Sequence, residues 1–293
     1  MSTTSAKADP AEIAAHKKVT MITPHGRWFE LDLHEVWEAR ELIWRFIHRD
    51  FITNNKQTVL GPLWFVIPPL ATTLIFTIIF GGFANISTEG TPKVLFFMAG
   101  VIFWNYFANC LTRTSNTFGG NSGLFGKIYI PRLTVPISLV ISNLITLAVQ
   151  VVVFLAMYAW FFFTTKQLAP NLWILAIPLF LFQLGALGLG FGCIVSSLTT
   201  YYRDFALMLG FGIQLMMYAS CVVIPLSTVP QEWQWLVALN PVVPVMEAMR
   251  YALFGSGSLY PQYLAISVIM TVVIVYAGLL LFKRMERTFM DTI

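Results

Sequence analysis

The chain has 293 residues, of which 57% are hydrophobic and 11% charged, and its formal net charge at pH 7 is +4. A typical soluble domain carries about 25% charged residues, so this composition excludes a soluble domain and predicts a polytopic membrane protein. The lysines and arginines cluster near the ends of apolar runs, which relates the positive charge to membrane orientation and not to nucleic-acid binding. Cys110, Cys193 and Cys221 lie inside apolar runs without metal-ligand spacing, so they predict neither a disulfide nor a metal site.

Residues 1–30 contain no apolar core and are predicted to form a flexible cytoplasmic tail, which is neither a secretory signal nor a span. Residues 31–56 predict an amphipathic interface helix on the inner membrane surface. At 100° per residue, its apolar side chains fall on one broad arc, which only Arg40 and Asp50 interrupt. Tryptophans on such a helix are typical of the lipid headgroup region. A surface helix of a soluble domain is the alternative, which the adjacent membrane segment disfavours.

Charged residues divide residues 57–287 into six uncharged windows, each able to hold the roughly 20 apolar residues of a transmembrane helix. An even number of crossings puts both termini on one side of the membrane. Of the 18 lysines and arginines, only Lys93, Lys166 and Arg250 fall on the opposite side, which predicts a multi-pass inner-membrane protein with both termini in the cytoplasm. The predicted all-α domain has transmembrane helices near residues 62–83, 94–115, 134–163, 172–198, 205–224 and 261–282.

Two of these spans have distinctive residues. The first carries Pro62, Pro68 and Pro69, which remove backbone donors and kink a helix. Lipid cannot replace those donors, so we expect neighbouring helices or internal water to do so. In the fourth, Gly188 and Gly192 have the GxxxG spacing that permits close helix packing.

Two loops contain short structured segments. The inner loop, residues 115–132, predicts a short helix parallel to the membrane and facing the cytoplasm. The outer segment, residues 225–257, has two short apolar pieces broken by Asn240 and proline, which predicts a re-entrant helical hairpin between the fifth and sixth spans. Glu247 and Arg250 have the i, i+3 spacing of an ion pair on one helix face.

Chemical motifs are sparse. The glycine-rich run before Lys127 is no phosphate-binding loop, because Asn121 replaces the first glycine and Ile128 follows the lysine. No carboxylate or histidine lies within a predicted span, which disfavours a proton- or sodium-coupled transporter. We therefore expect no catalytic residue, metal or cofactor in this chain. A membrane enzyme that acts on lipid-linked sugars through Glu232 or Glu247 is the alternative.

An aromatic stripe runs along the second predicted span. Phe96, Phe103 and Phe107 fall on one helical face, and Trp104 lies beside it. Such a face can stack on sugar rings in a translocation path, because stacking is broad and weakly directional. The rings can equally face lipid or neighbouring helices. Both interpretations stay open at this point.

Four local patterns between residues 36 and 287 resemble one family. They are RDFITNNKQTVLGPLWFVIPPL from Arg49, FGKIYIPR from Phe125, YRD ending at Asp204 and LNPVVPVMEAMRYALFG from Leu239. In this order the chain resembles the membrane subunits of type 2 ABC exporters of lipid-linked polysaccharides such as O-antigen, capsule and teichoic acid. The resemblance implies a homodimer, a separate ATPase subunit that binds ATP and Mg²⁺, and a glycan that crosses between the two membrane subunits. A permease for drugs or small lipids with the same architecture is the alternative, differing only in cargo.

The resemblance also implies roles for individual residues. The interface helix is expected to act as a lever that tilts the proline-kinked first span when the ATPase closes. The ATPase-coupling residues are Arg49, Asp50, Leu124, Phe125, Lys127, Tyr129, Arg132, Arg203 and Asp204, the translocation path is Phe96, Phe103, Trp104 and Phe107, and the outer gate is Trp233, Trp235, Glu247 and Arg250.

Overall fold

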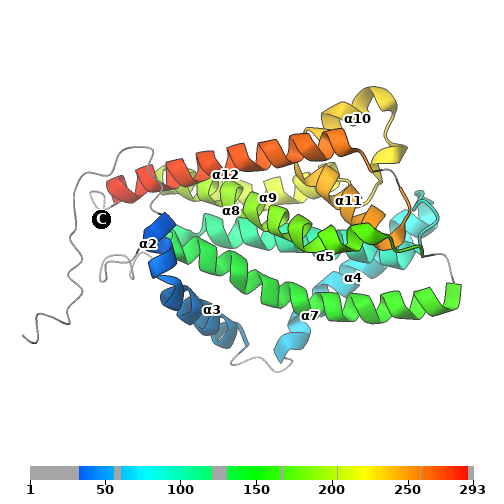
Figure 1. The fold of residues 1–293 in the computed structure, drawn as a ribbon, viewed down its shortest axis with the longest axis horizontal. Coiled ribbons are helices and arrows are strands. Elements are labelled where there is room, and N and C mark those ends of the chain that lie inside the picture. The colour runs from blue at the N-terminus through cyan, green and yellow to red at the C-terminus, as the bar shows by residue number, and fades with distance from the viewer. Residues whose placement is uncertain are drawn as a thin grey trace, which may run out of the picture. The chain divides into compact units, whose positions relative to one another are not determined.

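Long apolar helices dominate the computed structural model of the chain (Figure 1). Every element of the described residues is helical, which confirms the predicted all-α class. Within the part of the chain that the structure describes, five helical segments are long and apolar enough to cross a membrane. The structure describes residues 33–55, 61–120, 131–165, 168–202, 204–257 and 259–289, so the predicted N-terminal tail lies outside the described residues. The five candidate spans are Gly61–Phe83, Lys93–Ser115, Thr134–Thr165, Leu172–Thr200 and Pro261–Met285, close to five of the six predicted ranges.

The first candidate span consists of three helical pieces. A 3₁₀ helix, η1 (Gly61–Phe65), precedes α4 (Ile67–Phe76), and a π-helical segment, η2 (Thr77–Phe83), follows it. Pro68 and Pro69 occupy the first turn of α4, where a helix leaves its N–H groups unbonded and tolerates proline. The prolines therefore place the break between η1 and α4.

The centre of the fold is α5 (Lys93–Ser115). In its apolar 18-residue window 83% of the residues are buried, against 17% to 33% in the corresponding windows of the other four candidate spans. It packs closely against α8 (Ile177–Tyr201), which follows the short η3 (Leu172–Ala176). A Cβ atom on Gly188 would lie 2.5 Å from Cys110 Cβ, and one on Gly192 would lie 2.5 Å from Thr114 Cβ. The predicted close packing at the GxxxG pair is confirmed. The remaining long helices are α7 (Thr134–Thr165) and α12 (Pro261–Phe289).

The predicted fifth span is shorter than expected. Helix α9 (Asp204–Ala219) has 16 residues, or about 24 Å at 1.5 Å per residue, whereas a bilayer core is about 30 Å thick. It ends before the predicted residue 224 because the chain turns there, with Cys221 in the left-handed region at φ 54°. By length, the described residues therefore contain five candidate spans, and the predicted sixth crossing is not confirmed.

The predicted interface helix forms two pieces, α2 (Leu33–Glu38) and α3 (Arg40–Asn55), separated at Ala39. Figure 1 shows α3 inclined to α7, beside the N-terminal part of that helix, and the two are in contact. Phe46 and Ile47 are buried, but Trp37 is 70% exposed and Trp44 is 69% exposed. Part of the apolar arc therefore packs against the protein, and the tryptophans face outward.

The outer segment forms a 3₁₀ turn, η4 (Leu226–Thr228), and two short helices, α10 (Gln231–Ala238) and α11 (Val242–Phe254). Asn240 separates the helices, and its Oδ1 accepts a hydrogen bond from Val242 N at 3.1 Å. In Figure 1, α10 and α11 lie at the opposite end of the long helices from α2 and the C-terminal end of α12. The two predicted helical pieces are present. Their depth in a membrane stays a prediction.

Candidate functional site

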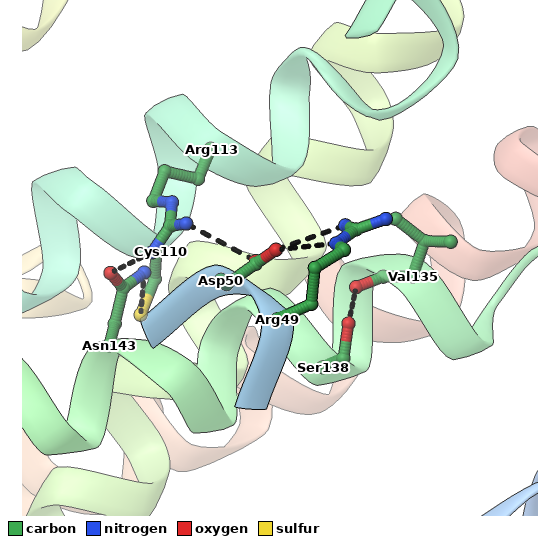
Figure 2. A network of polar contacts seen from close by, with 7 residues as sticks. All are labelled: Arg49, Asp50, Cys110, Arg113, Val135, Ser138 and Asn143. Carbon is green, nitrogen blue, oxygen red and sulfur yellow. Dashed lines mark hydrogen bonds and ion pairs between the residues drawn. The ribbon is translucent and has the colours of Figure 1, made fainter. Parts of the chain in front are cut away.

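A polar network joins three helices at the end of the fold that the sequence predicts to face the cytoplasm (Figure 2). On α3, Asp50 Oδ1 lies 2.9 Å from Arg49 Nη2, and Asp50 Oδ2 lies 3.3 Å from Arg113 Nη2 on α5. Arg113 Nη1 donates to Asn143 Oδ1 on α7 at 3.1 Å. Asn143 Nδ2 in turn donates to Cys110 Sγ at 3.7 Å. We call these five residues the inner network.

The inner network explains why a carboxylate interrupts the apolar arc of the interface helix. The Asp50 side chain is only 11% exposed, and both of its oxygens accept from guanidinium groups. Leaving a buried charge without its partner costs about 3–5 kcal/mol. Asp50 therefore attaches α3 to α5. Arg49 is 50% exposed and lies over the Phe46 ring at 4.9 Å, so its other side is accessible.

A cavity of about 810 Å³ opens beside the inner network. Arg113 and Asn116 line it from α5 and its C-terminal end, Thr199 and Thr200 from α8, and Leu209 from α9. The threonine hydroxyls both donate to the carbonyl of Ser196, so they offer only lone pairs to the cavity. Its wall is therefore partly apolar and partly polar, and Arg113, the cation among the described lining residues, is already paired.

The predicted ATPase-coupling residues are only partly visible. Arg132 is buried before the start of α7, and Asp204 is exposed at the start of α9. Arg49 and Asp50 belong to the inner network. The other five residues, Leu124, Phe125, Lys127, Tyr129 and Arg203, lie outside the described residues, so the coupling surface as a whole stays a prediction.

The aromatic stripe lies in the core of the single chain. Phe96, Phe103, Trp104 and Phe107 are between 0% and 5% exposed. Phe107 packs edge-on against Phe191 of α8, with ring centroids 6.4 Å apart. The geometry therefore favours the interpretation in which the rings face neighbouring helices. Their predicted role in a translocation path stays a prediction.

At the opposite end, which the sequence predicts to face outward, Arg250 holds several elements together. The predicted ion pair is confirmed, because Arg250 Nη1 lies 3.1 Å from Glu247 Oε1. The guanidinium also donates to the carbonyl oxygens of Cys221 at 2.7 Å and Val222 at 2.6 Å. It lies 4.0 Å from the centroid of the Phe96 ring, in the geometry of a cation–π contact. This outer cluster joins α11 to α5 and to the turn after α9.

The four predicted outer-gate residues divide into two pairs. Glu247 is 5% exposed and Arg250 is 2% exposed, whereas Trp233 and Trp235 of α10 are each 57% exposed. Burial raises the pKa of the Glu247 carboxyl, and Arg250 opposes that rise. Glu247 Oε1 also accepts from Leu226 N at 3.3 Å. Because Glu247 is buried and bonded, it is poorly placed for the catalytic role in the enzyme alternative.

Sequence reasoning missed Arg113 and Asn143, which complete the inner network. Two signals were present. Asp50 is a lone carboxylate on an apolar arc, and Asn143 is a polar residue inside an uncharged window. Each requires a buried partner, but neither signal says which residue provides it.

The inner network and the outer cluster both fall within a region shared with known proteins. Residues 41–254 match the protein family described as ABC-2 type transporter. The O-antigen export system permease protein RfbA of Klebsiella pneumoniae is 26% identical over 249 residues, covering 83% of this chain and 92% of the relative. RfbA of Myxococcus xanthus is 21% identical over 268 residues (89% and 98%), and the polysialic acid transport protein KpsM of Escherichia coli is 25% identical over 251 residues (83% and 93%). With this match running from α3 to the end of α11, the chain belongs to the ABC-2 type transporter family.

Proposed function

We propose that this chain is the transmembrane permease subunit of an ABC exporter that moves a lipid-linked polysaccharide across the cytoplasmic membrane. The cargo is of the O-antigen, capsule or teichoic-acid type. The observation that carries the proposal is similarity over at least nine tenths of the length of relatives named for O-antigen export and polysialic acid transport.

In this proposal, energy comes from a separate subunit that binds ATP and Mg²⁺. The sequence has no phosphate-binding loop of its own, since Asn121 and Ile128 break the required pattern around Lys127. Helix α3 is the part of the described chain that suits contact with such a partner. It carries an accessible Arg49, and the inner network ties it to α5 and α7.

Two copies of the chain form the exporter in this proposal. Helix α9 is apolar and has no buried residue, although it lies in a packed helical protein. A Cβ atom on Gly210 or Gly212 would meet nothing within 4 Å, so another helix can approach closely there. A second copy on this surface supplies the missing neighbour, and the glycan passes between the copies. Helix α9 then completes a sixth crossing, which keeps both termini in the cytoplasm.

Loss of the surface glycan tests the cargo. Deleting the gene for this chain is expected to remove the glycan from the cell surface and to leave its lipid-linked form inside, while reintroducing the gene restores export. Intact surface glycan together with altered sensitivity to drugs would support the alternative, a drug or small-lipid permease.

The purified chain alone should hydrolyse no ATP. Turnover of lipid-linked sugars by the purified chain without any ATPase would support the enzyme alternative.

A further inference from the structure

The prolines at the break in the first candidate span leave the backbone carbonyl of Phe65 without its usual partner. In a continuous α-helix, the carbonyl of Phe65 accepts from the N–H of residue 69. Residue 69 is proline, which has no N–H. Gln150 Nε2 on α7 donates to Phe65 O at 2.9 Å instead. A side chain of a neighbouring helix thus replaces the missing backbone donor, as the prolines of the first span predict.

Gln150 differs in this respect from Gln183, another buried glutamine of the candidate spans. Gln150 is 6% exposed and Gln183 is 7% exposed. Gln183 Nε2 donates to two side chains of α12, Ser267 Oγ at 2.9 Å and Thr271 Oγ1 at 3.2 Å. It joins two helices whose backbones are continuous, whereas Gln150 completes the hydrogen bonding of a helix where it breaks. The apolar interior of a membrane provides no other donor for that carbonyl.

One face of α7 lies against both the interface helix and the break between η1 and α4. Asn143 and Gln150 are seven residues apart, which places them two turns apart on the same side of α7. Asn143 bonds Arg113, which pairs with Asp50 of α3. Gln150 bonds Phe65 at the end of η1. The two segments that precede α4 in the chain, α3 and η1, are therefore both joined by hydrogen bonds or ion pairs to the same face of α7.

We propose that Gln150 is a positioning residue of the transport cycle. By supplying the donor that Pro69 lacks, it fixes the bend between η1 and α4 on α7. A displacement of α3 and α7 is then transmitted to α4 and is not lost through flexibility between η1 and α4. Gln150 acts through the Phe65 carbonyl and touches no cargo. The transport part of this inference rests on the proposed function.

The test compares the same substitution at the two glutamines. The complex of the full chain with its ATPase is reconstituted in vesicles, and glycan exported per ATP hydrolysed is measured. Gln150→Met should lower this ratio by about fivefold or more, because the Phe65 carbonyl loses its donor. The matched control Gln183→Met should stay within about twofold of the wild type. An unchanged ratio in Gln150→Met overturns the proposal.

A rescue separates positioning from simple packing. Pro69→Ala returns a backbone N–H to position 69, which can donate to the Phe65 carbonyl. The double variant Pro69→Ala/Gln150→Met should therefore recover the ratio that Gln150→Met loses. If Gln150→Met alone does not assemble, recovery of assembly in the double variant supports the proposal equally. A double variant no better than Gln150→Met overturns it, since a packing defect on α7 gains nothing from a donor at residue 69.

A distance measurement tests the bend without any cargo. Spin labels are placed through Trp44→Cys on α3 and Leu74→Cys on α4, both at exposed positions, while the three native cysteines are buried. Gln150→Met should broaden the distribution of distances between the labels, and Pro69→Ala should narrow it again. An unchanged width overturns the proposal. A wild-type complex that exports no glycan defeats only the proposed function, because the label distances still decide whether Gln150 fixes the bend.

Discussion

The guanidinium of Arg250 holds three segments together because it has more donors than one carboxylate can accept. One nitrogen is shared by Glu247 and the carbonyl of Cys221, and another donates to the carbonyl of Val222. Asp50 shows the converse case, one carboxylate shared by two guanidinium groups. In both places a charge in an apolar environment is compensated by several partners, which is what burial requires.

Replacing Arg250 tests this account of the outer cluster. Arg250→Met should lower the free energy of unfolding by about 3–5 kcal/mol, because Glu247 is then buried without its partner. Denaturant unfolding of the purified chain in detergent measures the change. Exchanging the charges, as Glu247→Arg/Arg250→Glu, should not restore stability, because a carboxylate at position 250 faces the carbonyl oxygens of Cys221 and Val222. If the exchanged variant fully recovered the free energy of unfolding, the outer cluster would act only as a simple ion pair.

The helices differ in how closely they approach one another. Helix α8 meets α5 at Gly188 and Gly192, and on another side Gly190 lies against α12, where a Cβ atom would be 3.0 Å from Val275 Cα. Because lipid tails are as apolar as the helices themselves, contact between helices in a membrane depends on such close packing. The glycines of α8 therefore determine that this helix lies between α5 and α12.

A bulky residue at position 192 tests this packing. Gly192→Leu should lower the free energy of unfolding by at least about 1–3 kcal/mol, because the new side chain meets Thr114 and the backbone of Leu111. The matched control is Gly212→Leu on α9, which has open space around it and should leave the stability of the single chain at or above that of the wild type. Equal stability of the two variants would contradict the close packing of α5 and α8.

In the whole molecule, the buried helix and the exposed helices have different structural roles. Helix α5 is almost completely enclosed, and its aromatic residues form the core against which the other helices pack. Helix α9 is apolar but unburied, and α3 presents exposed tryptophans. An enclosed centre with apolar surfaces around it is consistent with a subunit that needs both lipid and further protein neighbours.

Cross-linking tests the proposed dimer. Gly212→Cys on α9 should form a disulfide-linked dimer under mild oxidation in membranes, because two copies bring this position together. Val272→Cys on α12, which is 63% exposed, is the control and should stay monomeric. The native cysteines are buried and do not compete. Dimer formation at position 272 but not at 212 would move the interface from α9 to α12.

The sequence alone determined the all-helical class and the positions of five candidate spans, because charge and hydrophobicity along the chain are local properties that set where an apolar helix can begin and end. It also indicated the break at Pro68 and Pro69 and the pairing of Glu247 with Arg250, which depend on neighbours in the chain. Only the tertiary structure decided that the aromatic face of α5 is enclosed, that α9 stops at Ala219, and that the donors for Asp50 and Phe65 come from Arg113 and Gln150. These features depend on contacts between residues far apart in the chain, and hydrophobic periodicity marks which face of a helix is apolar without specifying what covers it.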